Sequence, residues 1–213
     1  MRTLLDAYCG AGGATAGYRR AGFEVVGVDI APQPNYPGDD LVLGDAVSFI
    51  RHHGHLFDAV HASPPCQAHS PLGALSPDKV YPRLIEPTRQ ALEVTGRPWV
   101  IENVMAAPLV GGIVLCGGMF GLRTYRHRRF EPGGGLVLTA PDHPPHVVRT
   151  ATSRRRERWD QGWHVSVTGD VGTYLGPEAM GIDWMSGDEL CQAIPPVYSF
   201  VIGCQLMALV CQG

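Results

Sequence analysis

The sequence alternates short apolar runs with segments of helical spacing, and this alternation most constrains the fold. The apolar runs end in turn residues and lie at residues 3–7, 24–29, 41–44, 57–62 and 99–103. Stretches with helical spacing separate several of them, at residues 14–21, 46–53 and 85–95. Strands that alternate with helices need crossover connections, which give a mostly parallel sheet. The sequence therefore predicts an α/β fold with helices on both faces of a mostly parallel sheet.

The length of the chain limits the number of domains. A chain of 213 residues, 45% of them hydrophobic, can build one sizeable core but not two ordinary domains. The composition changes after residue 130, where three glycines and several prolines precede an arginine-rich run. A final apolar helix is expected at residues 200–210. We therefore expect a catalytic domain at residues 1–130, a small insertion at 131–177 and a return to the first domain at 178–213.

Charge and cysteine usage exclude several classes of protein. The net charge of −3 argues against a general polyanion binder, so any nucleic-acid contact must be a local patch. The six cysteines form no C-x-x-C pair and no zinc-type Cys/His spacing, and the cluster His52, His53 and His55 has no carboxylate partner, so we expect no metal and no disulfides. The chain has no signal-peptide pattern and no membrane-length apolar run, which predicts a cytoplasmic protein without membrane contact.

A glycine loop follows the first apolar run. Residues 6–13 read Asp-Ala-Tyr-Cys-Gly-Ala-Gly-Gly and precede a helical segment. Glycines at this position let backbone N–H groups approach an anionic ligand, although the loop alone is equally consistent with an ordinary turn. Asp29 ends the second run, where a carboxylate can accept hydrogen bonds from ribose hydroxyls. The spacing G-x-G-G weakens the alternative of a dinucleotide-dependent reductase.

Two further side chains end apolar runs and could carry chemistry. Cys66 follows two prolines in the segment Ser63-Pro64-Pro65-Cys66-Gln67, so it is held rigidly at a strand tip, as a nucleophile would be. Glu102 follows the apolar run at residues 99–101. Taken alone, a cysteine is more often a small core residue and a glutamate is more often solvated. Because ligands bind at the carboxyl ends of parallel strands, we expect both side chains at one edge of the sheet.

Four motifs in order resemble the DNA cytosine-5 methyltransferase family. The glycine loop is similar to that family's D-x-F-C-G-x-G-G motif, with Tyr8 in the aromatic position. Residues 64–67 contain the P-C-Q motif and residues 102–104 are Glu-Asn-Val, as in the E-N-V motif. Arg126 and Arg128 are similar to the R-x-R motif. The resemblance covers residues 3 to about 130 and implies a Rossmann-like methyltransferase fold that binds S-adenosylmethionine.

The resemblance also implies the roles of individual residues. Cys66 is the expected nucleophile at carbon 6 of cytosine, Glu102 the group at N3, and Arg128, with Arg126, the group that binds O2. The expected cofactor contacts, with Asp29 at the ribose and Asp45 near the adenine amine, are Tyr8, Gly10, Gly12, Gly13, Asp29, Ile30, Asp45 and Pro64. The implied activity is methylation of carbon 5 of cytosine in DNA, as in restriction-modification systems.

Two departures from the family pattern leave alternatives open. The family's G-N-x-V motif is replaced by Ile202-Gly203-Cys204-Gln205, and the insertion is shorter than the family's target-recognition domain. RNA or a free cytosine nucleotide is therefore an alternative substrate, and an idle nucleic-acid-binding module is an alternative class. The insertion carries five arginines that we expect to contact DNA phosphates, namely Arg149, Arg154, Arg155, Arg156 and Arg158.

Overall fold

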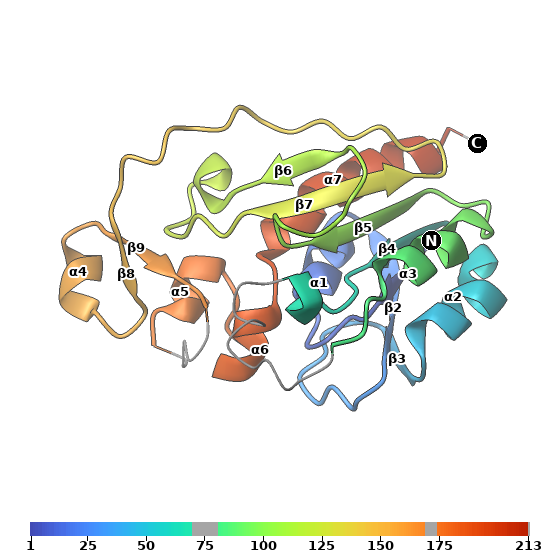
Figure 1. Cartoon of the computed structure of the whole chain (residues 1–213), viewed down its shortest axis with the longest axis horizontal. Helices are drawn as coiled ribbons and strands as arrows, with labels where there is room; N and C mark the ends of the chain where they lie inside the picture. Colours follow the sequence, from blue (N-terminus) through green and yellow to red (C-terminus); the bar gives the residue numbers. More distant parts are fainter. Residues whose placement is uncertain (70–80, 169–173, 213) are drawn as a thin grey trace.

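The computed structural model describes residues 1–69, 81–168 and 174–212, and a seven-stranded sheet forms its centre (Figure 1). The strand order is β3-β2-β1-β4-β5-β7-β6, in which the first five strands are parallel and β7 is antiparallel to both β5 and β6. The strands are β1 (Arg2–Ala7), β2 (Phe23–Asp29), β3 (Asp40–Leu43), β4 (Ala59–Ala62), β5 (Trp99–Asn103), β6 (Ile113–Leu115) and β7 (Arg128–Gly133). This sheet confirms the predicted α/β fold.

Helices cover both faces of the sheet, as the sequence predicts. Along β1, Leu4 and Leu5 are both fully buried and belong to different apolar clusters, because successive side chains of a strand point to opposite faces. The cluster around Leu4 includes residues of α1 (Gly13–Arg20) and α7 (Pro196–Val210). The cluster around Leu5 includes residues of α2 (Ala46–His53) and α3 (Ile85–Glu93).

A third apolar cluster holds a small lobe beside the sheet (Figure 1). Its buried side chains include Trp159, Val165, Met180 and Leu190. The lobe contains β8 (Thr150–Thr152), α4 (Arg156–Asp160), the parallel partner strand β9 (His164–Ser166), α5 (Gly176–Met180) and α6 (Gly187–Gln192). Residues from the expected insertion and from the expected C-terminal return thus share this cluster. The expected division at residue 177 stays a prediction, and residues 169–173 of that insertion lie outside the described residues.

An extended segment at residues 137–149 connects the end of the sheet to the small lobe (Figure 1). Leu136 and Leu138 at its start pack into the main core. Further on, the backbone N–H of Thr139 donates to Oε1 of Gln205 on α7 at 2.8 Å. We call residues 137–149 the strap. None of the helices among the described residues has the length and apolarity needed to cross a bilayer.

Helices α1 and α7 pack very closely, and Gly17 permits this contact. A Cβ atom at Gly17 would lie 2.0 Å from the Pro196 carbonyl oxygen and 2.1 Å from Ser199 Oγ. Gly203 on α7 is similar, because a Cβ there would lie 2.7 Å from the Cβ of Ala21. Gly203, which lies in the segment that replaces the family's G-N-x-V motif, therefore allows α1 and α7 to pack closely.

We predict that Gly17→Ala destabilises the protein. The added methyl group cannot fit without moving α7, and overpacking of this kind costs about 1–3 kcal/mol or more, which outweighs the gain in helix propensity of about 1 kcal/mol. Gly44→Ala is the control, because nothing lies within 4 Å of the position of its Cβ. Chemical denaturation measures both variants. Equal free energies of unfolding for Gly17→Ala and the parent protein would contradict the packing argument.

Candidate active site

A cavity of about 600 Å³ opens at the carboxyl ends of the parallel strands. Ten of the twelve residues expected at the site line it, namely Tyr8, Gly10, Gly13, Asp29, Ile30, Asp45, Pro64, Cys66, Glu102 and Arg128. Gly12 and Arg126 do not line this cavity. Segments far apart in the sequence thus meet at one site, as expected for the edge of a parallel sheet.

The glycine loop and two carboxylates form one end of the cavity. The backbone N–H of Gly10 donates to Asp29 Oδ2 at 3.0 Å, and the N–H of Ala31 donates to Oδ1 at 3.0 Å. These bonds fix the Asp29 carboxylate in the cavity wall. Asp45 caps α2 by accepting a 2.8 Å hydrogen bond from the Ser48 N–H at Oδ1. The side chain of Ile30 is 82% exposed beside them.

Gly12 shapes the loop without facing the cavity. It is the N-cap of α1 with φ +77°, in the left-handed region, and a Cβ there would lie 2.3 Å from the Pro37 ring. Tyr8 also has a positive φ of 58°, and its hydroxyl is 2.8 Å from the Thr88 hydroxyl on α3. The backbone of this loop is therefore held in conformations that suit glycine, which fixes the N–H groups beside the cavity.

Asp6 begins the glycine-loop motif, but the motif predicted no role for it. It lines the cavity, is 1% exposed and accepts a hydrogen bond from the Thr15 hydroxyl at 2.5 Å through Oδ2. Its other oxygen, Oδ1, is buried and has no hydrogen-bond partner among the described residues. Burial raises the pKa of Asp6 to about 7. An unpartnered buried carboxylate oxygen beside a cavity is suited to a cationic group of a ligand.

Cys66 lies at the other end of the cavity, on the turn that follows β4. The side-chain amide of Asn103, at the end of β5, donates to the Pro64 carbonyl at 2.8 Å. Asn103 is buried, and its Oδ1 accepts from the Val104 N–H at 2.9 Å. The second residue of the Glu-Asn-Val motif thus fastens the Pro-Pro turn that carries Cys66. Burial raises the pKa of the Cys66 thiol, while nearby Arg128 acts in the opposite direction.

Glu102 and Arg128 form an ion pair in the wall beside Cys66. Arg128 Nε lies 3.1 Å from Glu102 Oε1, and Glu102 is only 7% exposed. Burial raises the pKa of Glu102, and the charge of Arg128 opposes this rise. A desolvated carboxyl beside one arginine can therefore hold or release a proton.

A buried row of polar groups supports Glu102. The Tyr18 hydroxyl lies 2.9 Å from His61 Nδ1, His61 Nε2 lies 2.9 Å from Ser63 Oγ, and the Ser63 side chain hydrogen-bonds with Glu102. Burial lowers the pKa of His61 to about 3, so its ring is neutral. A neutral ring donates through one nitrogen and accepts through the other, which orients the whole row. The signal in the sequence was a single histidine within the buried strand Ala-Val-His-Ala.

Arg126 is directed at the protein backbone. Its guanidinium donates to the carbonyl oxygens of Ala193 at 2.8 Å, Cys191 at 2.6 Å, and Val167. Its φ of 27° is unusual for a residue with a side chain. It lines a second cavity, of about 540 Å³, that Cys66 also borders. Three donors of Arg126 are thus engaged by the C-terminal end of α6 and by residue 167, and its expected catalytic role stays a prediction.

A further wall of the cavity comes from α6 and the two residues that follow it. Glu189 and residues 191–194 line the cavity. The Trp184 indole N–H donates to the Ala11 carbonyl at 2.9 Å and ties this part of the chain to the glycine loop. Cys204, from the segment that departs from the family pattern, is exposed on α7. The sequence analysis missed this wall because residues 191–194 match no motif.

The arginine-rich run lies on the surface of the small lobe. All five expected phosphate contacts are exposed: Arg149, Arg154, Arg155, Arg156 and Arg158. Arg155 lies 3.6 Å from Glu157, and Arg156 lies 3.4 Å from Glu178. Exposed ion pairs of this kind contribute only about 0–1 kcal/mol, so they leave these side chains able to exchange partners.

Comparison with known proteins adds evidence on the fold. No family model and no curated protein matches the sequence. The structure is similar to a crystal structure described as a candidate DNA modification methyltransferase encoded within an E. coli prophage, with 13% identity, a TM-score of 0.60 and 100% coverage of both chains. It is also similar to Spodoptera frugiperda DNMT2, with 12% identity, a TM-score of 0.61 and coverage of 97% of this chain and 100% of that chain.

A third solved structure is also similar over nearly the whole chain. The Dnmt2 methyltransferase of S. pombe has 14% identity and a TM-score of 0.57, with coverage of 98% of this chain and 99% of that chain. The chain therefore has, over nearly its full length, the α/β fold of these methyltransferase structures, with a sheet of order 3-2-1-4-5-7-6.

Proposed function

We propose that this protein transfers a methyl group from S-adenosylmethionine to carbon 5 of cytosine in DNA, with Cys66 as the covalent nucleophile. The observation that carries the proposal is that Cys66, Glu102 and Arg128 line the same cavity as the glycine loop and Asp29. A nucleophile, a proton-holding carboxyl and a cation beside a nucleotide-type pocket are the groups that cytosine methylation requires. A module that only binds nucleic acid needs no nucleophile.

The residues at the glycine-loop end fit S-adenosylmethionine. The unpartnered Oδ1 of Asp6 is suited to the ammonium group of the methionine part. The Asp29 carboxylate, held by two N–H groups, is suited to the ribose hydroxyls, and Asp45 to the adenine amine. The exposed apolar side chain of Ile30 offers a surface for the adenine ring. When bound, this cofactor supplies an electrophilic methyl group.

Cys66 starts the reaction by adding to carbon 6 of cytosine. Carbon 5 is too weakly nucleophilic to accept a methyl group directly, and addition of a thiolate at carbon 6 makes it an enamine carbon. Because burial raises the pKa of Cys66, the thiol must lose its proton beside the positive charge of Arg128. The Pro-Pro turn and Asn103 hold the sulfur in place for this attack.

Glu102 and Arg128 assist the addition from the edge of the base. A proton held by Glu102 and shared with N3 withdraws electrons from the ring, and the raised pKa of Glu102 favours that proton-bearing form. Arg128 binds O2 and stabilises the negative charge that develops there. After carbon 5 gains the methyl group, water or another base takes the proton of carbon 5. The electron pair left behind re-forms the C5–C6 double bond and expels the Cys66 thiolate. If the cytosine lies in a duplex, it must be flipped out to reach Cys66.

Two observations favour DNA as the substrate. The exposed arginines of the small lobe give residues 149–158 a surplus of positive charge in a protein of net charge −3. One structure of the same fold is described as a candidate DNA modification methyltransferase. RNA and free cytosine nucleotides are the competing substrates.

We predict that the parent protein transfers tritiated methyl groups to DNA and that Cys66→Ala abolishes transfer while it changes cofactor affinity by no more than a few-fold. Duplex DNA, single-stranded DNA, RNA and free nucleotides are compared in parallel. Cys204→Ala, at an exposed cysteine on α7, is the matched control.

DNA with 5-fluorocytosine should form a denaturant-stable adduct with the parent, because fluorine cannot leave as a proton.

Substantial turnover by Cys66→Ala would contradict covalent catalysis. Transfer to RNA or to free nucleotides in place of DNA would contradict the proposed substrate but keep the chemistry. The absence of transfer to all four, from a protein that binds S-adenosylmethionine, would favour an idle binding module.

We predict that Asp6→Asn weakens S-adenosylmethionine binding by about 1.5–3 kcal/mol, the usual contribution of a hydrogen bond to a charged group. Because the pKa of Asp6 is raised to about 7, affinity in the parent should fall as the pH drops below 7 and Asp6 becomes protonated. The variant should lack this pH dependence. Calorimetric titration at several pH values measures both effects. An unchanged affinity in Asp6→Asn would show that Asp6 does not contact the cofactor.

Although Asp6→Asn should weaken cofactor binding, it should raise the stability of the ligand-free protein. An ordinary aspartate has a pKa of 3.8, so the unfolded chain ionises first and the native state loses stability as the pH rises from about 4 to about 7. Asp6→Asn removes this loss, and the ligand-free variant should therefore be more stable than the parent at pH 8. A lower melting temperature for the variant than for the parent at pH 8 would contradict the inference that burial raises the pKa of Asp6.

We predict that replacing Arg154, Arg155 and Arg156 by alanine reduces the salt dependence of DNA binding. Each neutralised phosphate contributes about 0.9 to the slope of log affinity against log salt on duplex DNA, so the triple variant should lose up to about three such contributions. A control triple variant replaces Arg20, Arg51 and Arg97, which are exposed on the main domain and carry the same charge. Equal slopes for the two triple variants would contradict a phosphate contact at the small lobe.

A further inference from the structure

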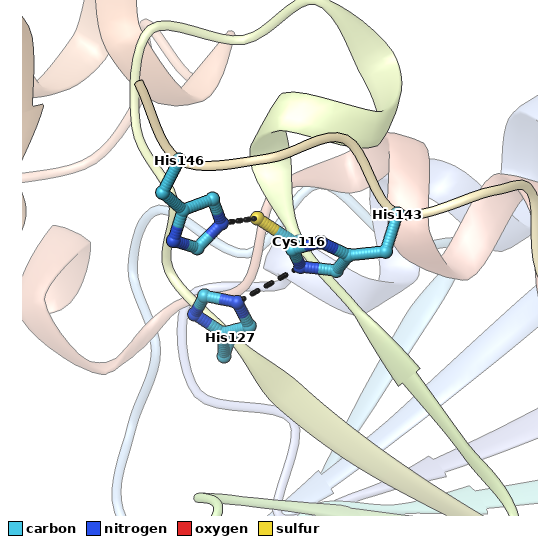
Figure 2. A group of neighbouring side chains, drawn as sticks. All are labelled: Cys116, His127, His143 and His146. Carbon is cyan, nitrogen blue, oxygen red and sulfur yellow. Dashed lines mark hydrogen bonds between the residues drawn. The ribbon is translucent and has the colours of Figure 1, made fainter. Parts of the chain in front are cut away.

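Four potential metal ligands converge outside the cavity described above (Figure 2). Cys116 Sγ and one ring nitrogen from each of His127, His143 and His146 all lie within 4.8 Å of one another. His127 Nε2 is 3.1 Å from His143 Nε2, and Cys116 Sγ is 3.3 Å from His146 Nε2. Figure 2 shows the thiol and the three imidazole rings pointing toward a common centre.

The four residues come from three separate parts of the fold. Cys116 follows β6 and is the N-cap of the short helix η4 (Gly117–Phe120). His127 directly precedes β7, the antiparallel neighbour of β6. His143 and His146 both lie on the strap. The cluster thus joins the strap to the β6–β7 hairpin, and no local spacing in the sequence could reveal it.

The distances are close to those around a tetrahedral zinc ion. Zn–S bonds of about 2.3 Å and Zn–N bonds of about 2.0–2.1 Å place neighbouring ligand atoms about 3.3–3.6 Å apart. Two of the pairs are already near this range, at 3.1 and 3.3 Å. The widest separation, 4.8 Å, must shorten by about 1.2–1.5 Å to reach the tetrahedral range. The two ligands on the strap, His143 and His146, are exposed.

Hydrogen bonding among these groups explains the cluster less well than a shared ion does. Two histidine Nε2 atoms that face each other need one ring protonated there and the other unprotonated, which satisfies only that pair. Cys116 is fully buried, so its sulfur is directed at the cluster and away from solvent.

We propose that Cys116, His127, His143 and His146 form a structural zinc site that fastens the strap to the β6–β7 hairpin. One thiolate and three imidazoles are a ligand set that zinc accepts, and four protein ligands make the closed coordination typical of structural sites. This proposal differs from the expectation of no metal, which rested on ligand spacing in the sequence. The proposal does not depend on the proposed methyl transfer.

The surrounding contacts give the site a role in the fold. Before the cluster, the strap is tied to α7 by the hydrogen bonds between Thr139 and Gln205. After the cluster, the Tyr125 hydroxyl hydrogen-bonds with the N–H and the carbonyl of Val148. The Tyr125 ring stacks on His146, with centroids 3.7 Å apart. The metal would close the middle of this path, next to Arg128, whose Nη1 donates to the His127 carbonyl at 2.9 Å.

We predict that untagged protein binds one zinc ion per chain, measured by elemental analysis and by titration of chelator-treated protein. Cobalt should bind in place of zinc and give visible bands of tetrahedral coordination with a thiolate-to-cobalt charge-transfer band in the near ultraviolet. Cys116→Ser should remove the charge-transfer band. His143→Ala and His146→Ala should each weaken zinc binding by at least about tenfold, the loss that follows removal of even an outer-shell partner.

Two control variants test whether the effect is specific. Cys204→Ser removes an exposed thiol on α7, and His52→Ala removes an exposed histidine on α2, so both should bind zinc as the parent does. A chelator should lower the melting temperature of the parent and of both controls, and that of His143→Ala by a smaller amount. If Cys116→Ser does not fold, His143→Ala decides, because His143 is exposed on the strap and its loss leaves the core intact.

Three results would overturn the proposal. The first is the absence of both bound zinc and a cobalt–thiolate band in folded parent protein. The second is zinc affinity in His143→Ala and His146→Ala equal to that of the parent. The third is a loss of zinc in Cys204→Ser or His52→Ala as large as that in the variants of the cluster.

Discussion

Parallel pairing of β1, β4 and β5 is the constraint on which the candidate site depends. The register pairs Ala7 with Ala62 and Ala62 with Ile101. The residues that follow these three, Tyr8, Ser63 and Glu102, therefore lie at the same edge of the sheet. The glycine loop and the Pro-Pro-Cys turn begin at this edge, beside Glu102. A slip of one residue in β5 would turn Glu102 to the opposite face of the sheet. The buried hydrogen bond from Asn103 to the turn after β4 holds this edge together.

Burial places opposite demands on the two reactive groups of the proposed mechanism. It raises the pKa of both Glu102 and Cys66, and so favours the uncharged form of each. For a group that shares its proton with N3 of cytosine this is the working form, but a nucleophile must lose its proton. Arg128 opposes the shift at both sites. Its positive charge favours the thiolate form of Cys66 while the carboxyl of Glu102 stays desolvated, and the buried row through Ser63 keeps that carboxyl oriented.

The sequence predicted those features that depend on local pattern. Alternating apolar and helical segments predicted the five parallel strands and the helices between them, and motif order predicted ten of the residues that line the cavity. Features that depend on contacts between distant segments were missed. The unpartnered oxygen of Asp6 is a property of the folded cavity, and His61 was one polar residue in an apolar run. Arg126 stands in a matched motif, yet its guanidinium binds backbone carbonyls of a segment about 65 residues further along the chain.

The small lobe and the strap raise a different physical question, which is how a chain segment without regular structure keeps a fixed path. Ordering each residue of such a segment costs roughly 1–2 kcal/mol of backbone entropy, and hydrogen bonds at exposed positions return only part of this. Leu136 and Leu138 anchor one end in the core, but the stretch from His143 to His146 has little apolar surface to bury. A metal ion offsets the entropy with a few strong bonds where a core is absent. Because His127 is adjacent to Arg128, the same ion would also stiffen the start of β7, so the proposed zinc site links the path of the strap to the position of an active-site arginine.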